Sequence, residues 1–295
     1  GISVSTVGLG LGYNEDLMAN LASSSDGNHI FVENENDLIA AFDREFGDIL
    51  SIVAQEVLVQ INFAPGMKPV QVIGREADIA GQKVTTTMNQ LYGSQEKYVI
   101  VEVEAASGEA NATSDVAKVI VTYANMMTKT GDQLSSKISV KFSEDAALVE
   151  KSINQSVMAA SVLMVATKAN EEAVKLRDEG KIKEAKIVLT GNRVFIDTNN
   201  KVLKSKQLED YGVWNDLQSE KLEGVDWAGN RKQMRAQQVA NYRQIGHGGS
   251  ASDVEPLDDK KRLSVGHGPG GTVIIAPSSG NIIVTPTAPV QQKSR

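Results

Sequence analysis

The chain has 295 residues, a formal net charge of −7, a sequence pI near 5.2 and no cysteine. The acidic balance argues against a nucleic-acid partner, because phosphate binding rests on clustered Lys and Arg. The absence of Cys excludes disulfide scaffolds, thiolate metal sites and thiol catalysis. No run of residues approaches the ~18 apolar residues that a membrane helix needs.

Residues 1–50 alternate short β-type runs with helical patterns. The β-type runs cover residues 2–7 and 29–32, and helical patterns follow from Asn14 and from Asn36. This order is typical of a parallel sheet, so we predict a partial Rossmann-like α/β domain. The residues of the first helix that we expect on one apolar face are Leu17, Met18, Leu21 and Ala22.

Two strands are too few for a sheet of this kind, because a parallel sheet is buried on both faces and needs several neighbouring strands. The sequence also begins inside its first predicted strand. We therefore expect this chain to be the C-terminal part of a longer polypeptide. The alternative is a complete protein with an unusually small α/β subdomain.

Residues 51–143 change to a period of two and predict an antiparallel β-sandwich. Residues 47–54 read as a helix end or linker before it, and we expect turns at Ala80-Gly81, Tyr92-Gly93-Ser94 and Thr130-Gly131-Asp132. The expected strands cover residues 57–63, 70–73, 83–88, 98–104, 117–123 and 137–142.

Residues 144–245 predict a helical region. One helix is expected over 145–179, ended by Gly180, and a second follows from Ile182, so that 173–189 forms one helical hairpin. Two weaker helices are expected over 207–222 and 230–244, and Trp214 and Trp227 are interpreted as small-core residues.

Residues 246–295 form a tail rich in Gly, Pro and Ser, a composition that cannot bury enough apolar surface to stay ordered alone. Two β-type runs within 271–286 stand out from it. They predict either a hairpin or a strand added to a partner's sheet edge, and a floppy tail is the alternative.

The glycines at 8, 10 and 12 lie between a strand and a helix, as a dinucleotide-binding loop would. Their spacing lacks the third glycine of that fingerprint. Glu15 and Asp16 already place negative charge in the first helical turn, where a pyrophosphate would bind. We therefore do not predict a nucleotide site.

The histidines are His29, His247 and His267, and no pair has the spacing of metal ligands. A His-dependent catalytic triad is not expected. We interpret the acidic pairs Glu171-Glu172 and Asp258-Asp259 as solvated charges. We assign no catalytic, cofactor-binding or metal-binding residue to this chain, and we do not expect it to be an enzyme.

The opening resembles the last two strands and helices of a von Willebrand factor type A domain. It is most similar to the bacterial proteins related to calcium-activated chloride channel accessory proteins and inter-alpha-inhibitor heavy chains. The resemblance covers about 45 residues directly and extends loosely to about residue 143. It rests on Val4-Ser5-Thr6-Val7-Gly8-Leu9-Gly10, Asn14-Glu15-Asp16-Leu17-Met18, Leu21-Ala22, Gly27-Asn28-His29-Ile30-Phe31-Val32 and Asp37-Leu38-Ile39-Ala40-Ala41-Phe42.

The resemblance implies a domain that binds Mg²⁺ or Ca²⁺ at the top of its sheet, where a protein ligand completes the coordination. The family's Asp-x-Ser-x-Ser motif and its other metal ligands would all precede Gly1. No metal-binding residue is therefore transferred to this chain, and no cofactor is expected within it.

These observations favour a non-enzymatic protein-interaction or adhesion protein of the cell envelope or exterior, that is, extracellular, on the cell surface or in the periplasm. Its partner would be a protein ligand or a further copy of itself. One alternative is a self-assembling structural subunit. Another is the C-terminal region of an enzyme whose catalytic part lies upstream, such as a self-processing metalloprotease with an H-E-x-x-H motif there.

Overall fold

The computed structural model describes residues 2–47, 52–93, 96–106, 108–244, 282–286 and 290–292. They fall into two compact units. The first, the sheet unit, takes its described residues from Ser51–Met158 and Lys260–Arg295. The second, the mixed unit, takes them from Ile2–Leu50 and Ala159–Asp259, so it joins two stretches that are predicted above as separate domains.

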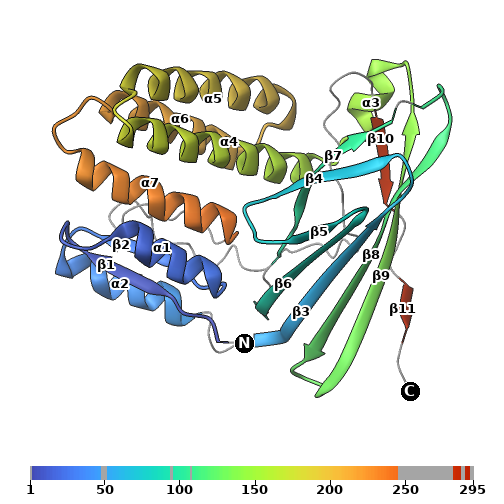
Figure 1. Ribbon diagram of the computed structural model, residues 1–295, viewed down its shortest axis with the longest axis horizontal. Coiled ribbons are helices and arrows are strands. Elements are labelled where there is room, and N and C mark those ends of the chain that lie inside the picture. The colour runs from blue at the N-terminus through green and yellow to red at the C-terminus, as the bar shows by residue number, and fades with distance from the viewer. Residues whose placement is uncertain are drawn as a thin grey trace. The chain divides into compact units, whose positions relative to one another are not determined.

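The strands of the sheet unit pair antiparallel throughout the described residues (Figure 1). The larger sheet has the order β10-β9-β8-β3-β6-β5, with β11 also on β9, and β4 and β7 form a separate pair. The elements are β3 (Ile52–Phe63), β4 (Met67–Ile73), β5 (Asp78–Ala80), β6 (Lys83–Tyr92), β7 (Ile100–Ala105), β8 (Thr113–Asn125), β9 (Thr130–Phe142), α3 (Ala146–Ser152), β10 (Ile282–Pro286) and β11 (Val290–Gln292).

An apolar core holds this unit together. On β3 the predicted alternation is confirmed, because Val57, Val59, Ile61 and Phe63 are all buried. Side chains of the β4–β7 pair, such as Val101, join the same core. The two sheets have seven strands and two strands, so the β-sandwich of 51–143 stays a prediction in its details.

Two boundaries in the sheet unit differ from expectation. β3 begins at Ile52, inside the segment interpreted as a helix end or linker. β9 begins at Thr130, where we predicted a turn. The chain reverses just before it, because the Asn125 side-chain oxygen accepts hydrogen bonds from the backbone N–H groups of Met127 at 3.0 Å and Thr128 at 3.2 Å.

The hairpin predicted within 271–286 is only partly described. Its first run lies outside the described residues. Its second run contains β10, which pairs with β9 of the same chain, Ile282 opposite Phe142. A tail strand therefore does add to a sheet edge, and the edge belongs to this chain.

The mixed unit begins with β1 (Thr6–Leu9), α1 (Glu15–Ser24), β2 (His29–Val32) and α2 (Glu35–Gly47). β1 and β2 are parallel, with Thr6 opposite His29, as the sequence predicted. The first strand begins at Thr6 rather than at residue 2. α1 lies against one side of the pair and α2 against the other (Figure 1).

The predicted apolar face of α1 is confirmed at Ala22 and wrong at Leu17 and Leu21. Leu17 and Leu21 are 64% and 49% exposed, whereas Ala19 and Ala22 are buried together with Glu15. The small alanines let the helix approach the strands closely. Glu15 can be buried although it is charged, because two cations of a helix far along the sequence form ion pairs with its carboxylate.

Four further helices complete the mixed unit. The first of them, α4, begins a few residues before the unit does. They are α4 (Gln155–Asp178), α5 (Ile182–Leu203), α6 (Lys206–Lys221) and α7 (Trp227–Tyr242). Gly180 ends α4 with a positive φ of 79°, a conformation that favours glycine. Trp214 and Trp227 pack against the core of these helices, as expected.

The single helix expected over 145–179 is wrong, because the chain forms α3 and α4 with a break between them. Ile153 leaves the helix with φ −63° and ψ 122°. The side chain of Asn154 then accepts a hydrogen bond from the Val157 N–H at 3.2 Å and begins α4. The apolar stripe continued through the break, so periodicity alone did not reveal it.

α7 packs against both α1 and β2, although about two hundred residues of sequence separate them (Figure 1). It is a polar helix, yet Lys232, Gln237, Gln238 and Asn241 are buried in it. Its place beside α1 organises the site described below. Among the described residues, no helix has the length and apolar character that crossing a membrane requires.

Candidate functional site

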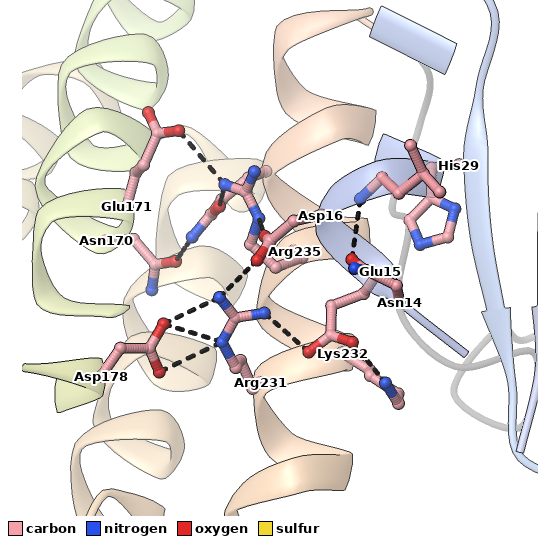
Figure 2. Close-up of polar contacts among 12 residues, drawn as sticks. Asn14, Glu15, Asp16, His29, Asn170, Glu171, Asp178, Arg231, Lys232 and Arg235 are labelled. Carbon is pink, nitrogen blue, oxygen red and sulfur yellow. Dashed lines mark hydrogen bonds and ion pairs between the residues drawn. The ribbon is translucent and has the colours of Figure 1, made fainter. Parts of the chain in front are cut away.

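An ionic cluster joins α1, α7 and α4 (Figure 2). Asn14 caps α1 by accepting a hydrogen bond from the Leu17 N–H at 3.0 Å. Glu15 and Asp16 therefore occupy the first helical turn, where negative charge is stabilised by the helix dipole. The cations that meet them come from α7, through Arg231, Lys232 and Arg235, and we call these five residues the ionic cluster.

Arg231 lies at the centre of the cluster (Figure 2). Its guanidinium donates to Glu15 at 2.6 Å and to Asp16 at 2.7 Å. It also donates to Asp178 of α4 at 2.9 Å. Such a fork of donors suits several carboxylates at once, so one side chain holds α1 and α4 to α7.

Lys232 is the deepest cation of the cluster, with 3% of its surface exposed. Its ammonium donates to the Tyr13 carbonyl at 2.8 Å and to the Glu15 carboxylate, and it lies 4.3 Å from the centre of the Tyr13 ring. A lysine is buried to this extent only when its charge is paired. Its loss would leave part of the Glu15 charge without a partner.

Arg235 extends the contacts toward α4. It forms an ion pair with Asp16 at 3.0 Å and donates to Glu171 at 3.2 Å. Glu171 also accepts a hydrogen bond from the Tyr242 hydroxyl at 3.2 Å. The interpretation of Glu171 as a merely solvated charge is therefore wrong, and the reason is its proximity to a helix that lies 64 residues later.

The cluster controls the ionisation of its carboxyl groups. Burial alone would raise the pKa of Glu15, but hydrogen bonds from Lys232 and Arg231 outweigh it and hold the pKa below its ordinary value. The same balance, with Arg231 and Arg235 as partners, lowers the pKa of Asp16. Both groups are therefore charged at neutral pH, and both charges are paired with cations of α7.

His29 is buried beside the cluster. Its Nδ1 lies 2.9 Å from the Thr6 hydroxyl and its Nε2 lies 3.4 Å from the Tyr13 hydroxyl. Burial lowers the His29 pKa from 6.5 to about 4, so the ring is neutral at pH 7 and a weak base. The two ring nitrogens thus lie beside hydroxyl groups, and we interpret the Thr6–His29–Tyr13 chain as support for the end of β1.

The described residues do not fit a divalent metal ion. Within them, no group of three or more His, Asp or Glu side chains is placed to hold one. Glu15 and Asp16, which follow β1 in the sequence, are bound by three cations. His247, His267, Asp258 and Asp259 lie outside the described residues.

A groove of about 910 Å³ runs along α4, and Asp16, Arg231 and Arg235 of the ionic cluster line part of it. Val165, Ala169 and Val188 contribute apolar surface, while Lys168 and Glu172 contribute charges of both signs. The mixture has no clear preference for an anion or a cation.

The outer edge of β1 is the second feature of the mixed unit. Among the described residues β1 pairs with β2 alone. The backbone N–H groups of Thr6 and Gly10 donate toward β2, at 2.8 Å to Asn28 and 2.9 Å to Val32. Because alternate residues of a strand point their N–H groups to opposite sides, those of Val7 and Leu9 point to the outer edge.

Apolar side chains surround that edge. Leu9 on β1 is 51% exposed, and Leu17 and Leu21 lie on the flank of α1 turned away from α7. Ile39 of α2 is 70% exposed. We call the outer edge of β1 with Leu9, Leu17 and Leu21 the open edge.

Sequence reasoning missed the partners of Glu15 and Asp16. It predicted α7 only as a weak helix and gave no sign that its cations meet α1. A signal was present in the polar sequence of α7, where Arg231, Lys232 and Arg235 recur at helical spacing. That pattern is also typical of a solvated helix face, so it did not identify a buried one.

No protein-family profile matches the chain, and no curated protein matches it. Solved structures do. One is a von Willebrand factor type A protein from Catenulispora acidiphila, with TM-score 0.54 and 14% identity over 70% of this chain and 50% of that one. Another is the ArnB paralog VWA2 from Sulfolobus acidocaldarius, with TM-score 0.46 and 16% identity over 82% of this chain and 56% of that one.

The chain thus spans about half the length of these structures. The first of them shows that the fold is similar to that of von Willebrand factor type A proteins. This agrees with the resemblance carried by the opening residues, and it supports the α+β class.

Proposed function

We propose that this chain is a non-enzymatic protein-interaction protein that binds its partner at the open edge. The observation that carries the proposal is the exposed apolar surface of Leu9, Leu17 and Leu21 beside β1, a strand that pairs with β2 within the described part of the chain. Exposed apolar patches and bare strand edges are typical of surfaces that meet other proteins. The similarity in fold to von Willebrand factor type A proteins supports the same class.

The finer assignments belong to this proposal. We infer an adhesion role at the cell envelope or exterior and kinship with the bacterial proteins related to calcium-activated chloride channel accessory proteins and inter-alpha-inhibitor heavy chains. Any metal-dependent ligand contact would be made by residues other than those described. A self-assembling structural subunit is the second candidate, and the same open edge favours it.

A photo-reactive residue at position 21 tests the proposal. Leu21 is exposed on the flank of α1, so light should join the full-length chain to one discrete protein partner. The same residue at Val194 of α5, which is 60% exposed, is the matched control and should give no such product.

A second change identifies the edge itself. Leu9→Pro removes an outward N–H group without emptying the core, because Leu9 is half exposed, and it should abolish the product from position 21. Leu9→Ala keeps the N–H group and should retain the product. A product that survives Leu9→Pro, or no discrete product at all, would contradict the proposal.

A further inference from the structure

The groove along α4 is lined by charged residues of two kinds. The first kind joins α4, α7 and α1 through ion pairs (Figure 2), and its members are Asp16, Glu171, Asp178, Arg231 and Arg235. The second kind lies on the exposed side of α4 and directly after its end, and its members are Lys168, Glu172, Lys175 and Glu179. We call these last four residues the α4 row.

The α4 row follows a single line along the helix. Its members are spaced by four, three and four residues, so at 3.6 residues per turn they stay within about 60° of one another around the axis. Their charges alternate along this line from Lys168 to Glu179. An alternating row is typical of a solvated helix face whose charges pair within the helix.

Pairing within the helix does not account for the centre of the row. Within the described part of the chain, Glu172 and Lys175 have no ion-pair partner. Glu179 is paired with Lys181 at 2.6 Å, but both side chains are exposed, and such a pair contributes little to stability. A Lys four residues before a Glu, as at Lys168 and Glu172, is also the weaker order for a pair within one helix.

The α4 row matches itself when it is reversed end to end. Lys168 then meets Glu179, and Glu172 meets Lys175, because the two pairs are centred on the same point of the helix. Each pair occurs twice across a twofold axis, so every member of the row meets an opposite charge. A parallel copy in the same register would instead set Lys against Lys and Glu against Glu. The order of charges thus favours an antiparallel copy of the same helix.

Apolar surface lies beside the row. Val165 of α4 is 39% exposed, and Ala169 and Val188 of α5 line the same groove. The hydrocarbon stems of Lys168 and Lys175 add to this surface. A helix laid along α4 would remove it from water, which stabilises the contact more than exposed ion pairs do. Apolar burial therefore supplies the affinity, and the charges set the direction.

We propose that α4 packs antiparallel against α4 of a second copy of this chain, about a twofold axis that passes between the two helices midway between Glu172 and Lys175. The axis is perpendicular to the helices, so α5 of one copy lies beside α5 of the other and the Val188 side of each groove meets its counterpart. Arg231 and Arg235 add little repulsion, because carboxylates of their own copy bind them. This surface is distinct from the open edge, so the inference goes beyond the proposed function.

Sedimentation equilibrium of the full-length chain at low and at high salt tests the inference. We expect a dimer of twice the 31.6 kDa chain mass at high protein concentration, and monomers on dilution. Added salt should shift the equilibrium toward monomers, because the charges of the α4 row are exposed and salt screens them.

Two charge reversals identify the surface. Glu172→Lys and Lys175→Glu each turn attractive contacts into repulsive ones on both sides of the axis, and each should weaken the dimer about tenfold. Mixed in equal amounts, the two variants should associate as tightly as the wild-type chain, because the reversed charge of each then meets its opposite in the other. This rescue also excludes a folding defect, since a misfolded variant would not restore the contact.

Glu220→Lys, at an exposed position of α6, is the matched control and should dimerise like the wild-type chain. A wild-type chain that stays monomeric at every concentration overturns the inference. A mixture of the two reversals that associates no better than either alone also overturns it, and so does a dimer that both reversals leave unchanged. None of these outcomes bears on the cross-link at position 21, so the proposed function stands or falls separately.

Discussion

The sheet unit and the mixed unit are stabilised by different interactions. The sheet unit buries aliphatic side chains such as Val59, Val84 and Ile138 between its strands. The mixed unit buries charges and amides along α7, where Lys232 and Gln238 are almost completely covered. Apolar contacts tolerate small shifts of their partners, whereas buried ions and amides depend on geometry and on each partner's presence.

The amide contacts extend this difference into the helices. Gln238 donates to Asn170 at 2.7 Å, and Asn241 donates to Thr167 at 2.8 Å. Asn192 donates to Asn215 at 2.9 Å. The mixed unit is therefore specified by pairs that must meet across helices, and it should respond to pH and to single polar substitutions in ways that the sheet unit does not.

The largest expected effect comes from Lys232→Met. Removing the buried ammonium breaks its bonds to Glu15 and Tyr13 and should lower the free energy of unfolding of the mixed unit by about 3 to 5 kcal/mol. Tryptophan fluorescence during urea unfolding measures this, because both tryptophans, Trp214 and Trp227, lie in the mixed unit. The exposed Lys118→Met of β8 is the control, and an equal loss in both variants would refute the role of the cluster.

The matching change in the sheet unit is Ile138→Ala. Ile138 is fully buried on β9, so the cavity should cost about 2 to 5 kcal/mol of the free energy of unfolding. Hydrogen exchange of β8 and β9 should rise while the tryptophan-detected midpoint stays unchanged. If that midpoint fell equally, the two units would unfold as one, and the contrast between them would have to be abandoned.

Acid should destabilise the mixed unit first. Between pH 6.5 and about 4 the unfolded chain binds a proton at His29 that the folded protein does not, so stability falls as the pH falls through this range. The loss is on the order of 3 kcal/mol. The lowered pKa values of Glu15 and Asp16 add a loss in the same direction at lower pH.

Urea unfolding followed by tryptophan fluorescence at pH 7, 6, 5 and 4 measures this loss. His29→Asn should lower stability at every pH but flatten its slope between pH 6.5 and 4. An unchanged slope would show that His29 titrates normally in the folded protein.

The smallest effect compares two helix caps. Asn14→Ala removes the bond to the Leu17 N–H at the start of α1, and Asp145→Ala removes the bonds to Ala147 and Leu148 at the start of α3. Each should cost about 1 kcal/mol. Only Asn14→Ala should shift the tryptophan-detected midpoint, because α3 lies in the sheet unit. A shift with Asp145→Ala would show that the units are coupled.

Predictions from the sequence succeeded where a local pattern carries the information. The alternation at Val57, Val59 and Ile61 identified β3, and the β-α-β-α order identified the parallel pair of β1 and β2. The predictions failed where the apolar spacing continues across a position at which the chain leaves the helix. The apolar spacing continued past Ile153, although the chain leaves the helix there.

The site illustrates the same limit. The position of Glu15 and Asp16 in a first helical turn was readable, because Asn14 precedes them as a cap. Their partners were not, since Arg231 lies 216 residues after Glu15. Leu17 and Leu21 were placed on the apolar face with Ala22, but only Ala22 of these three is buried, and it packs beside Ala19.

The sequence by itself determined the order and type of the elements, because hydrophobic period, caps and turns act over a few residues. Tertiary structure decided which face of α1 is buried, and it placed the polar α7 between α1 and α4. Those outcomes depend on which distant side chains meet, and no local pattern records that.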